Sequence, residues 1–161
     1  MSKELEGAQS SLCIQDVVLK ESNVLVRDGV DLRTLDRATI TSQNFRMTAK
    51  INELVSVNGN EEESFEYRFL YSVGVRIIFA SEEEEGFNEG FKPIVGIIAL
   101  FESRYSAVRK LTAEELDAFS VNNVGYHVWP YWREYVQSTC ARTGFAPSIE
   151  VPLYRISKVE E

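Results

Sequence analysis

The sequence has little of what metal and redox sites require. Its two cysteines, Cys13 and Cys140, lie far apart, and His127 is its single histidine. Structural zinc and iron–sulfur sites need several Cys or His ligands at close spacing, so neither kind of site is expected, and no cofactor is predicted. We expect both cysteines to act as small buried apolar side chains.

Long apolar runs and an excess of positive charge are also missing. No run approaches the ~18 apolar residues of a membrane-spanning helix, and the first residues lack the apolar segment of an export signal. The chain has 17 Lys and Arg against 25 Asp and Glu, for a net charge of −8. This negative field repels phosphate backbones. We therefore expect a cytoplasmic protein with no membrane span and no nucleic-acid partner.

Recognisable catalytic motifs are missing as well. The sequence contains no GxSxG, GxGxxG or phosphate-binding loop pattern, and a general base would have to be His127 acting alone. His127 is interpreted as a packed or surface residue of a helix. The acidic runs Glu61–Glu63 and Glu82–Glu85 are flanked by Gly and Asn, which is typical of solvated loops, and their role is left open. We predict no catalytic residue and no enzyme activity.

The pattern that dominates the chain is alternation of apolar and polar residues, which predicts strands. It runs over Leu12–Val26, residues 45–57, Phe65–Phe79 and Pro93–Tyr105. Asn58-Gly59-Asn60 predicts a hairpin turn, and the charged stretch from Asp28 to Ile40 predicts a long crossover between the first two strands. Together these features predict a four-stranded antiparallel meander with a long first crossover.

The last third of the chain changes to helical spacing. Thr112 and Glu115 have the spacing of a capping box, which predicts a helix beginning at Thr112. We expect a break near Asn122-Asn123, a second helix over 124–141 that stops before Gly144, and extended chain beyond it. Strands followed by helices predict an α+β fold with helices on one face of the sheet. We expect one domain over 1–161, with 1–11 and 157–161 flexible.

The chain is rich in apolar and aromatic residues, with 44% apolar residues that include 9 Phe, 7 Tyr and 2 Trp. One sheet and one helix layer cannot bury all of them, and large exposed apolar patches usually mark interfaces. The surplus predicts an oligomer with a groove for other polypeptides. Two alternatives remain open: a structural subunit whose apolar surface is consumed by a fixed interface, and a small-ligand-binding α+β domain whose cavity would use Tyr67, Tyr71, Tyr126 and Tyr131.

A segment in the last third resembles the SecB family of protein-export chaperones. It comprises Val128–Val136 (VWPYWREYV), followed by the Gly- and Pro-containing stretch Arg142–Leu153. The segment Leu111–Leu116 is closer to the SecB-like chaperones that accompany some toxin–antitoxin pairs. Ile14-Gln15 and Lys20-Glu21 are in step with the family's first strand, so the resemblance extends over about 12–154.

The resemblance implies an ATP-independent holdase that binds non-native polypeptides and assembles as a homotetramer, a dimer of dimers. Its clients would be preproteins for the Sec pathway or one dedicated partner such as an antitoxin. For docking of the motor protein SecA, Glu21 matches one of the family's acidic positions, whereas Leu25 departs from the next. The client-binding groove implied by the resemblance is lined by Leu32, Leu35, Ile40, Phe45, Met47, Phe145, Ile149, Val151, Leu153 and Tyr154.

Overall fold

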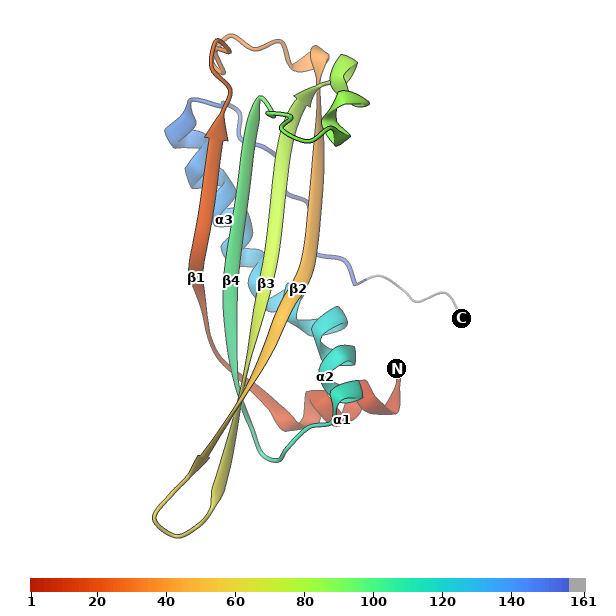
Figure 1. Ribbon diagram of the computed structural model, residues 1–161, viewed down its shortest axis with the longest axis vertical. Coiled ribbons are helices and arrows are strands. Elements are labelled where there is room, and N and C mark those ends of the chain that lie inside the picture. Colours follow the sequence, from red (N-terminus) through yellow and green to blue (C-terminus); the bar gives the residue numbers. More distant parts are fainter. Residues whose placement is uncertain (157–161) are drawn as a thin grey trace.

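Four antiparallel strands form a single sheet in the computed structural model, which describes residues 1–156. They are β1 (Leu12–Val26), β2 (Ile40–Val57), β3 (Glu63–Phe79) and β4 (Val95–Ala107). The order in the sheet is β1-β4-β3-β2 (Figure 1). The α+β fold class is therefore confirmed. The meander proper comprises β2, β3 and β4, and the crossover after Val26 carries the chain from one edge of the sheet to the other, so that β1 pairs with β4.

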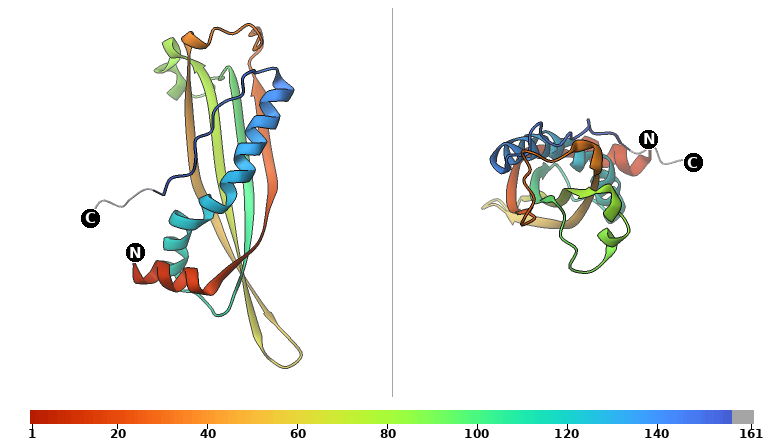
Figure 2. Two further views of the ribbon diagram at one scale, coloured as in Figure 1. Left: turned by 180° about the vertical axis from the view of Figure 1, so that it is seen from behind. Right: turned by 90° about the horizontal axis from the view of Figure 1, so that it is seen from above.

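The two main helices lie on the same face of the sheet (Figure 2). Helix α2 (Ala113–Phe119) begins after Thr112 with the predicted capping box, and α3 (Gly125–Thr143) ends at Gly144, whose left-handed φ of 79° suits glycine. The predicted break near Asn122-Asn123 is a π-helical turn, Ser120–Val124, which keeps the two helices continuous. The helix is therefore locally wider at this point, but it is not interrupted as the sequence analysis expected.

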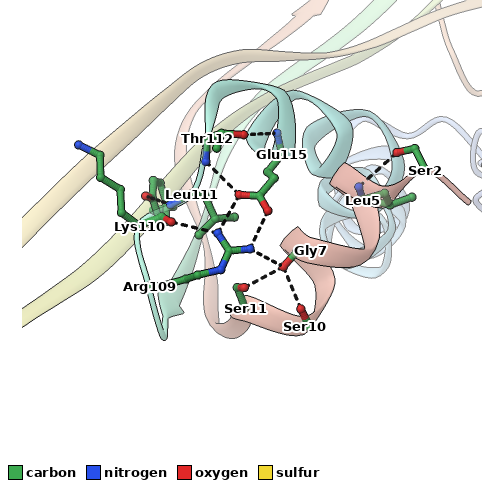
Figure 3. A network of polar contacts seen from close by, with 11 residues as sticks. Ser2, Leu5, Gly7, Ser10, Ser11, Arg109, Lys110, Leu111, Thr112 and Glu115 are labelled. Atoms are coloured by element: carbon green, nitrogen blue, oxygen red, sulfur yellow. Dashed lines mark hydrogen bonds and ion pairs between the residues drawn. The ribbon is translucent and has the colours of Figure 1, made fainter.

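The first eleven residues, for which the sequence suggested flexibility, instead contain helix α1 (Lys3–Ser11). The Ser2 hydroxyl caps its first turn, and Leu5 and Ala8 are buried. Arg109 joins α1 to the start of α2, because its guanidinium donates to the Gly7 carbonyl and to both carboxylate oxygens of Glu115 (Figure 3). This long-range contact orders a segment too short to be stable as an isolated helix. The predicted flexibility of 157–161 lies outside the described residues.

The core lies between the helices and one face of the sheet. On β3, the alternating residues Tyr67, Phe69, Tyr71, Val73, Val75 and Ile77 are buried, as the alternation predicted. Phe69, Tyr105 and Phe119 form an aromatic cluster, with the Tyr105 and Phe119 ring centroids 5.1 Å apart. Trp132 of α3 is also part of this core. We call the sheet face that packs against α3 the inner face, and the opposite one the outer face.

The prediction that both cysteines are buried is wrong for Cys13. Cys140 is buried in α3, but Cys13 is exposed. Cys13 pairs with Ser106, itself exposed, at a position where no helix covers the sheet. Burial raises the pKa of the Cys140 thiol. An edge strand covered on one face only therefore leaves one cysteine in solvent.

Within residues 1–156, no helix combines the length and the apolar character that crossing a membrane requires.

Candidate functional site

A groove of about 510 Å³ opens between the edge strand β2 and the chain that follows α3. We call it the inner groove. Its floor is formed by β3, one wall by β2 and the other by α3 with the C-terminal segment. The lining residues are Ser42, Asn44, Phe45, Arg46, Val73, Gly74, Val75, Trp129, Trp132, Glu150, Val151, Pro152, Leu153 and Arg155.

Residues 150–156, which we call the strap, lie along the helix-bearing side of the sheet (Figure 2). Three side chains donate hydrogen bonds to strap carbonyls. Trp129 Nε1 donates to the carbonyl of Pro152 at 2.6 Å, Arg133 Nε to Val151 at 3.1 Å, and Arg46 Nη2 to Arg155 at 2.9 Å. All three bonds are made to backbone, so they hold an extended chain without depending on its side chains.

Tyr154 anchors the strap through aromatic contacts. Its ring centroid lies 5.4 Å from that of Trp129, and the Arg46 guanidinium sits 4.4 Å from the Tyr154 centroid. A Cβ on Gly125 would come within 2.6 Å of the hydroxyl oxygens of both Tyr154 and Tyr71. Glycine at position 125 is therefore what lets the Tyr154 hydroxyl approach the helix. Burial, followed by the neighbouring Tyr154, raises the pKa of Tyr71, which stays neutral.

The structure distributes the ten predicted groove residues over three environments. Leu32, Phe145 and Ile149 are buried in the core, and Leu35, Ile40 and Val151 are half-buried and pack against it. Phe45, Val151 and Leu153 line the inner groove, with Tyr154 beside it. Met47 is exposed on β2 opposite Ser72, away from the groove. The structure therefore brings together fewer than half of the predicted residues.

Phe45 was predicted to line a client-binding groove, but its side chain points to the outer face of the sheet. Its ring covers Gly74 on the outer face, where a glycine Cβ would meet the ring at 2.3 Å. The groove-facing positions of β2 are instead the polar residues Ser42, Asn44 and Arg46, which pair with the buried Ile77, Val75 and Val73. Phe45 and Met47 therefore point away from the helices, whereas Ile40 and Ile51 of the same strand pack against the core, and alternation alone does not reveal this division.

Only Phe45, Val151 and Leu153 among the lining residues were named by the sequence analysis, and those it missed include Arg46, Trp129 and Trp132. Trp129 lies in Val128–Val136, the segment that resembles the SecB family, and this resemblance was the signal that could have identified Trp129 as a site residue. Arg46 carries no signal in the sequence, because its role depends on contact with Tyr154 and Arg155, more than a hundred residues away.

Glu21 is exposed on β1 and pairs with Leu100 of β4. The exposed position is accessible to a partner, and SecA docking there stays a prediction. The acidic run Glu82–Glu85 is not uniformly solvated. Glu82 forms a bidentate ion pair with Arg27, with both N–O distances 2.9 Å, and this contact lowers the pKa of the Glu82 carboxyl.

His127 is a half-buried residue of α3. Its Nδ1 lies 2.9 Å from the hydroxyl of Tyr105, and burial lowers the pKa of the imidazole, which is therefore neutral near pH 7. His127 is not among the residues that line the inner groove. Among residues 1–156, no cluster of three or more His, Cys, Asp or Glu side chains could hold a metal ion. The groove offers apolar surface beside an extended segment of the chain's own, whose carbonyls accept from Trp129 and Arg46, and this arrangement suits binding.

Comparison with known proteins identifies the fold. No protein-family model matches the sequence, and no curated protein matches it either. Among solved structures, the chain is similar to a SecB-like chaperone of Mycobacterium tuberculosis in complex with a ChAD peptide from the HigA1 antitoxin. The TM-score is 0.59 at 17% sequence identity, and the match covers 93% of this chain and 97% of that one. The chain therefore has the SecB-like fold, as the sequence resemblance predicted.

Proposed function

We propose that this protein is an ATP-independent chaperone that holds non-native polypeptides in the inner groove. The observation that carries the proposal is the groove itself, which already holds one extended segment, the strap, through hydrogen bonds from Trp129 and Arg46 to its backbone carbonyls, beside exposed apolar side chains such as Leu153. Apolar burial supplies affinity, and backbone hydrogen bonds tolerate varied sequences. The structural neighbour's complex with an antitoxin peptide supports polypeptides as the ligand class.

The edge of β2 offers a second means of holding an extended chain. β2 pairs with β3 on one side, and among the described residues no strand pairs with its other side. An extended client segment can add to such an edge through main-chain hydrogen bonds. The client would then lie between β2 and the strap, with its apolar side chains against Trp129 and Leu153.

Two classes of client fit this site. One is the range of preproteins destined for the Sec pathway, with Glu21 as a contact for SecA. The other is one dedicated partner such as an antitoxin, and the peptide in the neighbouring structure favours this second class. We also propose that the chaperone is cytoplasmic and assembles as a homotetramer.

The proposal is tested by aggregation of a chemically denatured model client without nucleotide. The wild-type protein is expected to suppress aggregation at stoichiometric ratio. Leu153 is 71% exposed, so Leu153→Asp should fold normally. A client segment would bury its carboxylate, at a cost of about 2 kcal/mol or more, which corresponds to roughly thirtyfold weaker binding.

Val108→Asp is the matched control, because Val108 is 82% exposed and does not line the groove. It should suppress aggregation as well as the wild type. The assignment of the inner groove fails if Leu153→Asp and Val108→Asp hold clients equally well. The chaperone function itself fails if the wild-type protein does not delay aggregation.

A further inference from the structure

A second groove, of about 570 Å³, lies on the outer face of the sheet. We call it the outer groove. One wall is the connection between β3 and β4, which projects on the side of the sheet away from α3 (Figure 2). The lining residues are Gln43, Asn44, Phe45, Gly74, Val75, Arg76, Phe87, Phe91, Pro93, Gly96 and Ile98.

The wall formed by the β3–β4 connection is fastened to the sheet by two arginines. Arg76 donates from Nε to Gln43 Oε1 at 2.8 Å and from Nη2 to the Gly86 carbonyl at 2.9 Å. Arg27 pairs with Glu82 and also donates to the Lys92 carbonyl. Both guanidinium groups lie within 6 Å of the Phe91 ring centroid, at 5.5 Å and 5.6 Å. The groove is therefore held open by the chain's own contacts.

The surface inside the outer groove is apolar. Phe87 is 84% exposed, Ile98 48% and Phe45 44%, all within one concave site. The glycines Gly74 and Gly96 contribute no side chain of their own to its floor. Exposed apolar side chains gathered in a groove mark an interaction surface.

The β3–β4 connection that forms this wall is acidic. Glu83, Glu84, Glu85 and Glu89 are exposed in the same connection that carries Phe87. Arg27 is paired with Glu82, whereas Arg76 donates to the neutral Gln43 side chain and Gly86 carbonyl and keeps its positive charge, and Lys92 is exposed in the same connection. The four carboxylates outnumber the charges of Arg76 and Lys92, so the connection carries an excess of negative charge, in the same sense as the net charge of −8.

We propose that the outer groove binds an extended polypeptide segment in which an apolar or aromatic residue is flanked by Lys or Arg. The apolar residue packs among Phe87, Ile98 and Phe45, and the flanking cations face the acidic β3–β4 connection. Asn44 and Phe45 of β2 and Gly74 and Val75 of β3 line both grooves, so the two sites adjoin at the β2 side of the sheet, and a client can pass over this edge. Binding here extends the polypeptide binding proposed above and rests on it for the class of ligand.

The test uses two fluorescent peptides with one aromatic core, one flanked by lysines and the other by glutamates, and measures Kd by anisotropy at low salt. The wild type should bind the lysine-flanked peptide about tenfold or more tighter, and this preference should fall as salt is added. The triple change Glu83→Lys, Glu84→Lys and Glu85→Lys should abolish or reverse the preference. Phe87→Ser should weaken binding of the lysine-flanked peptide several-fold. All four positions are exposed, so these variants keep their fold.

Leu153→Asp separates the two grooves, because it alters the inner groove only. Lysine-flanked peptide binding should survive Leu153→Asp. The outer-groove proposal is overturned if the triple variant keeps the wild-type preference, or if Phe87→Ser binds normally while Leu153→Asp does not. In those cases the aggregation assay still decides the proposed function independently. The protein could instead bind neither peptide but self-associate, with Phe87→Ser removing the self-association. That result would also overturn the outer-groove proposal, because the groove would then be filled by a second copy of the chain.

Discussion

At the scale of single residues, Glu115 links secondary and tertiary structure. Its carboxylate accepts from the Thr112 backbone N–H at 3.0 Å and from Arg109 at 2.6 and 2.9 Å. These contacts, with the Arg109 hydrogen bond as the largest cause, lower the pKa of Glu115 to about 2. One carboxylate therefore caps α2 and, through Arg109, holds α1 against it.

The first prediction concerns the pH dependence of this contact. The folded pKa of about 2 lies below the ordinary 4.5, so the charge stabilises the fold fully above pH 4.5 and loses this effect as the pH falls toward 2. Glu115→Gln keeps a capping acceptor but removes the charge. It should lower the free energy of unfolding at pH 7 by about 1 kcal/mol. Urea unfolding of both proteins should show this difference shrinking toward pH 2, and a difference that stays constant with pH would contradict the charge effect.

At the scale of elements, the position of the strap depends on how closely its side chains can approach α3. The strap forms no strand ladder, and its described contacts are the aromatic packing of Tyr154 and hydrogen bonds from Trp129, Arg133 and Arg46. Since the strap forms one wall of the inner groove, any change that releases it also widens the groove. Gly125, at the first position of α3, controls this contact.

We therefore predict that Gly125→Ala releases the strap without unfolding the protein. The new Cβ would displace the Tyr154 hydroxyl, while alanine favours the helix by up to ~1 kcal/mol relative to glycine, which limits the net loss of stability. Hydrogen exchange of residues 151–156 should become several-fold faster, with the strands unchanged. Arg142→Ala, at an exposed position near the end of the same helix and away from the strap, is the control and should leave strap exchange as in the wild type. Unchanged exchange in Gly125→Ala would show that Tyr154 does not anchor the strap.

At the scale of the whole molecule, one layer of helices does not cover the sheet. On β1, Ile14, Leu19, Val24 and Val26 pair with buried residues of β4 and so belong to the inner face, yet all four are exposed. On the outside of the helices, Val121, Tyr126 and Tyr131 are exposed as well. These apolar side chains provide the surface for the proposed homotetramer and leave the grooves near β2, at the opposite edge of the sheet, accessible.

The corresponding prediction is a solution mass of four times the 18.3 kDa chain, measured by size exclusion with light scattering. The double variant Leu19→Glu and Val24→Glu should run as a smaller species, because burying two unpaired carboxylates in an apolar interface costs several kcal/mol. Both sites are exposed in the single chain, so the variant should retain its circular dichroism spectrum. A monomeric wild type would refute this assembly.

Local patterns predicted much of the fold. Alternation placed all four strands, the boundaries of β1 agreed with the structure, and the Thr112 and Glu115 spacing placed the start of α2. Patterns did not predict α1, whose order depends on Arg109, or the π-helical turn that replaces the break at Asn122-Asn123. These features depend on contacts between residues far apart in the sequence.

The candidate site was less predictable than the fold. The crossover, β2 and the chain after α3 were expected to line a groove, and β2 and the chain after α3 do so. Individual residues were harder to place, because Leu32, Phe145 and Ile149 are as apolar as groove residues but are used in the core. Hydrophobicity shows that a side chain avoids water, but does not show whether its own fold or a partner covers it.

The amino-acid sequence by itself determined the strands, the helix start, the acidic charge and the surplus of aromatic side chains. Each follows from the period of a local pattern or from composition. Only the tertiary structure decided that β2 lies at the edge, that Phe45 faces outward, and that Arg46 contacts Tyr154, which is far away in the sequence. Strand order and the covered face depend on long-range packing, which residues adjacent in sequence do not encode alone.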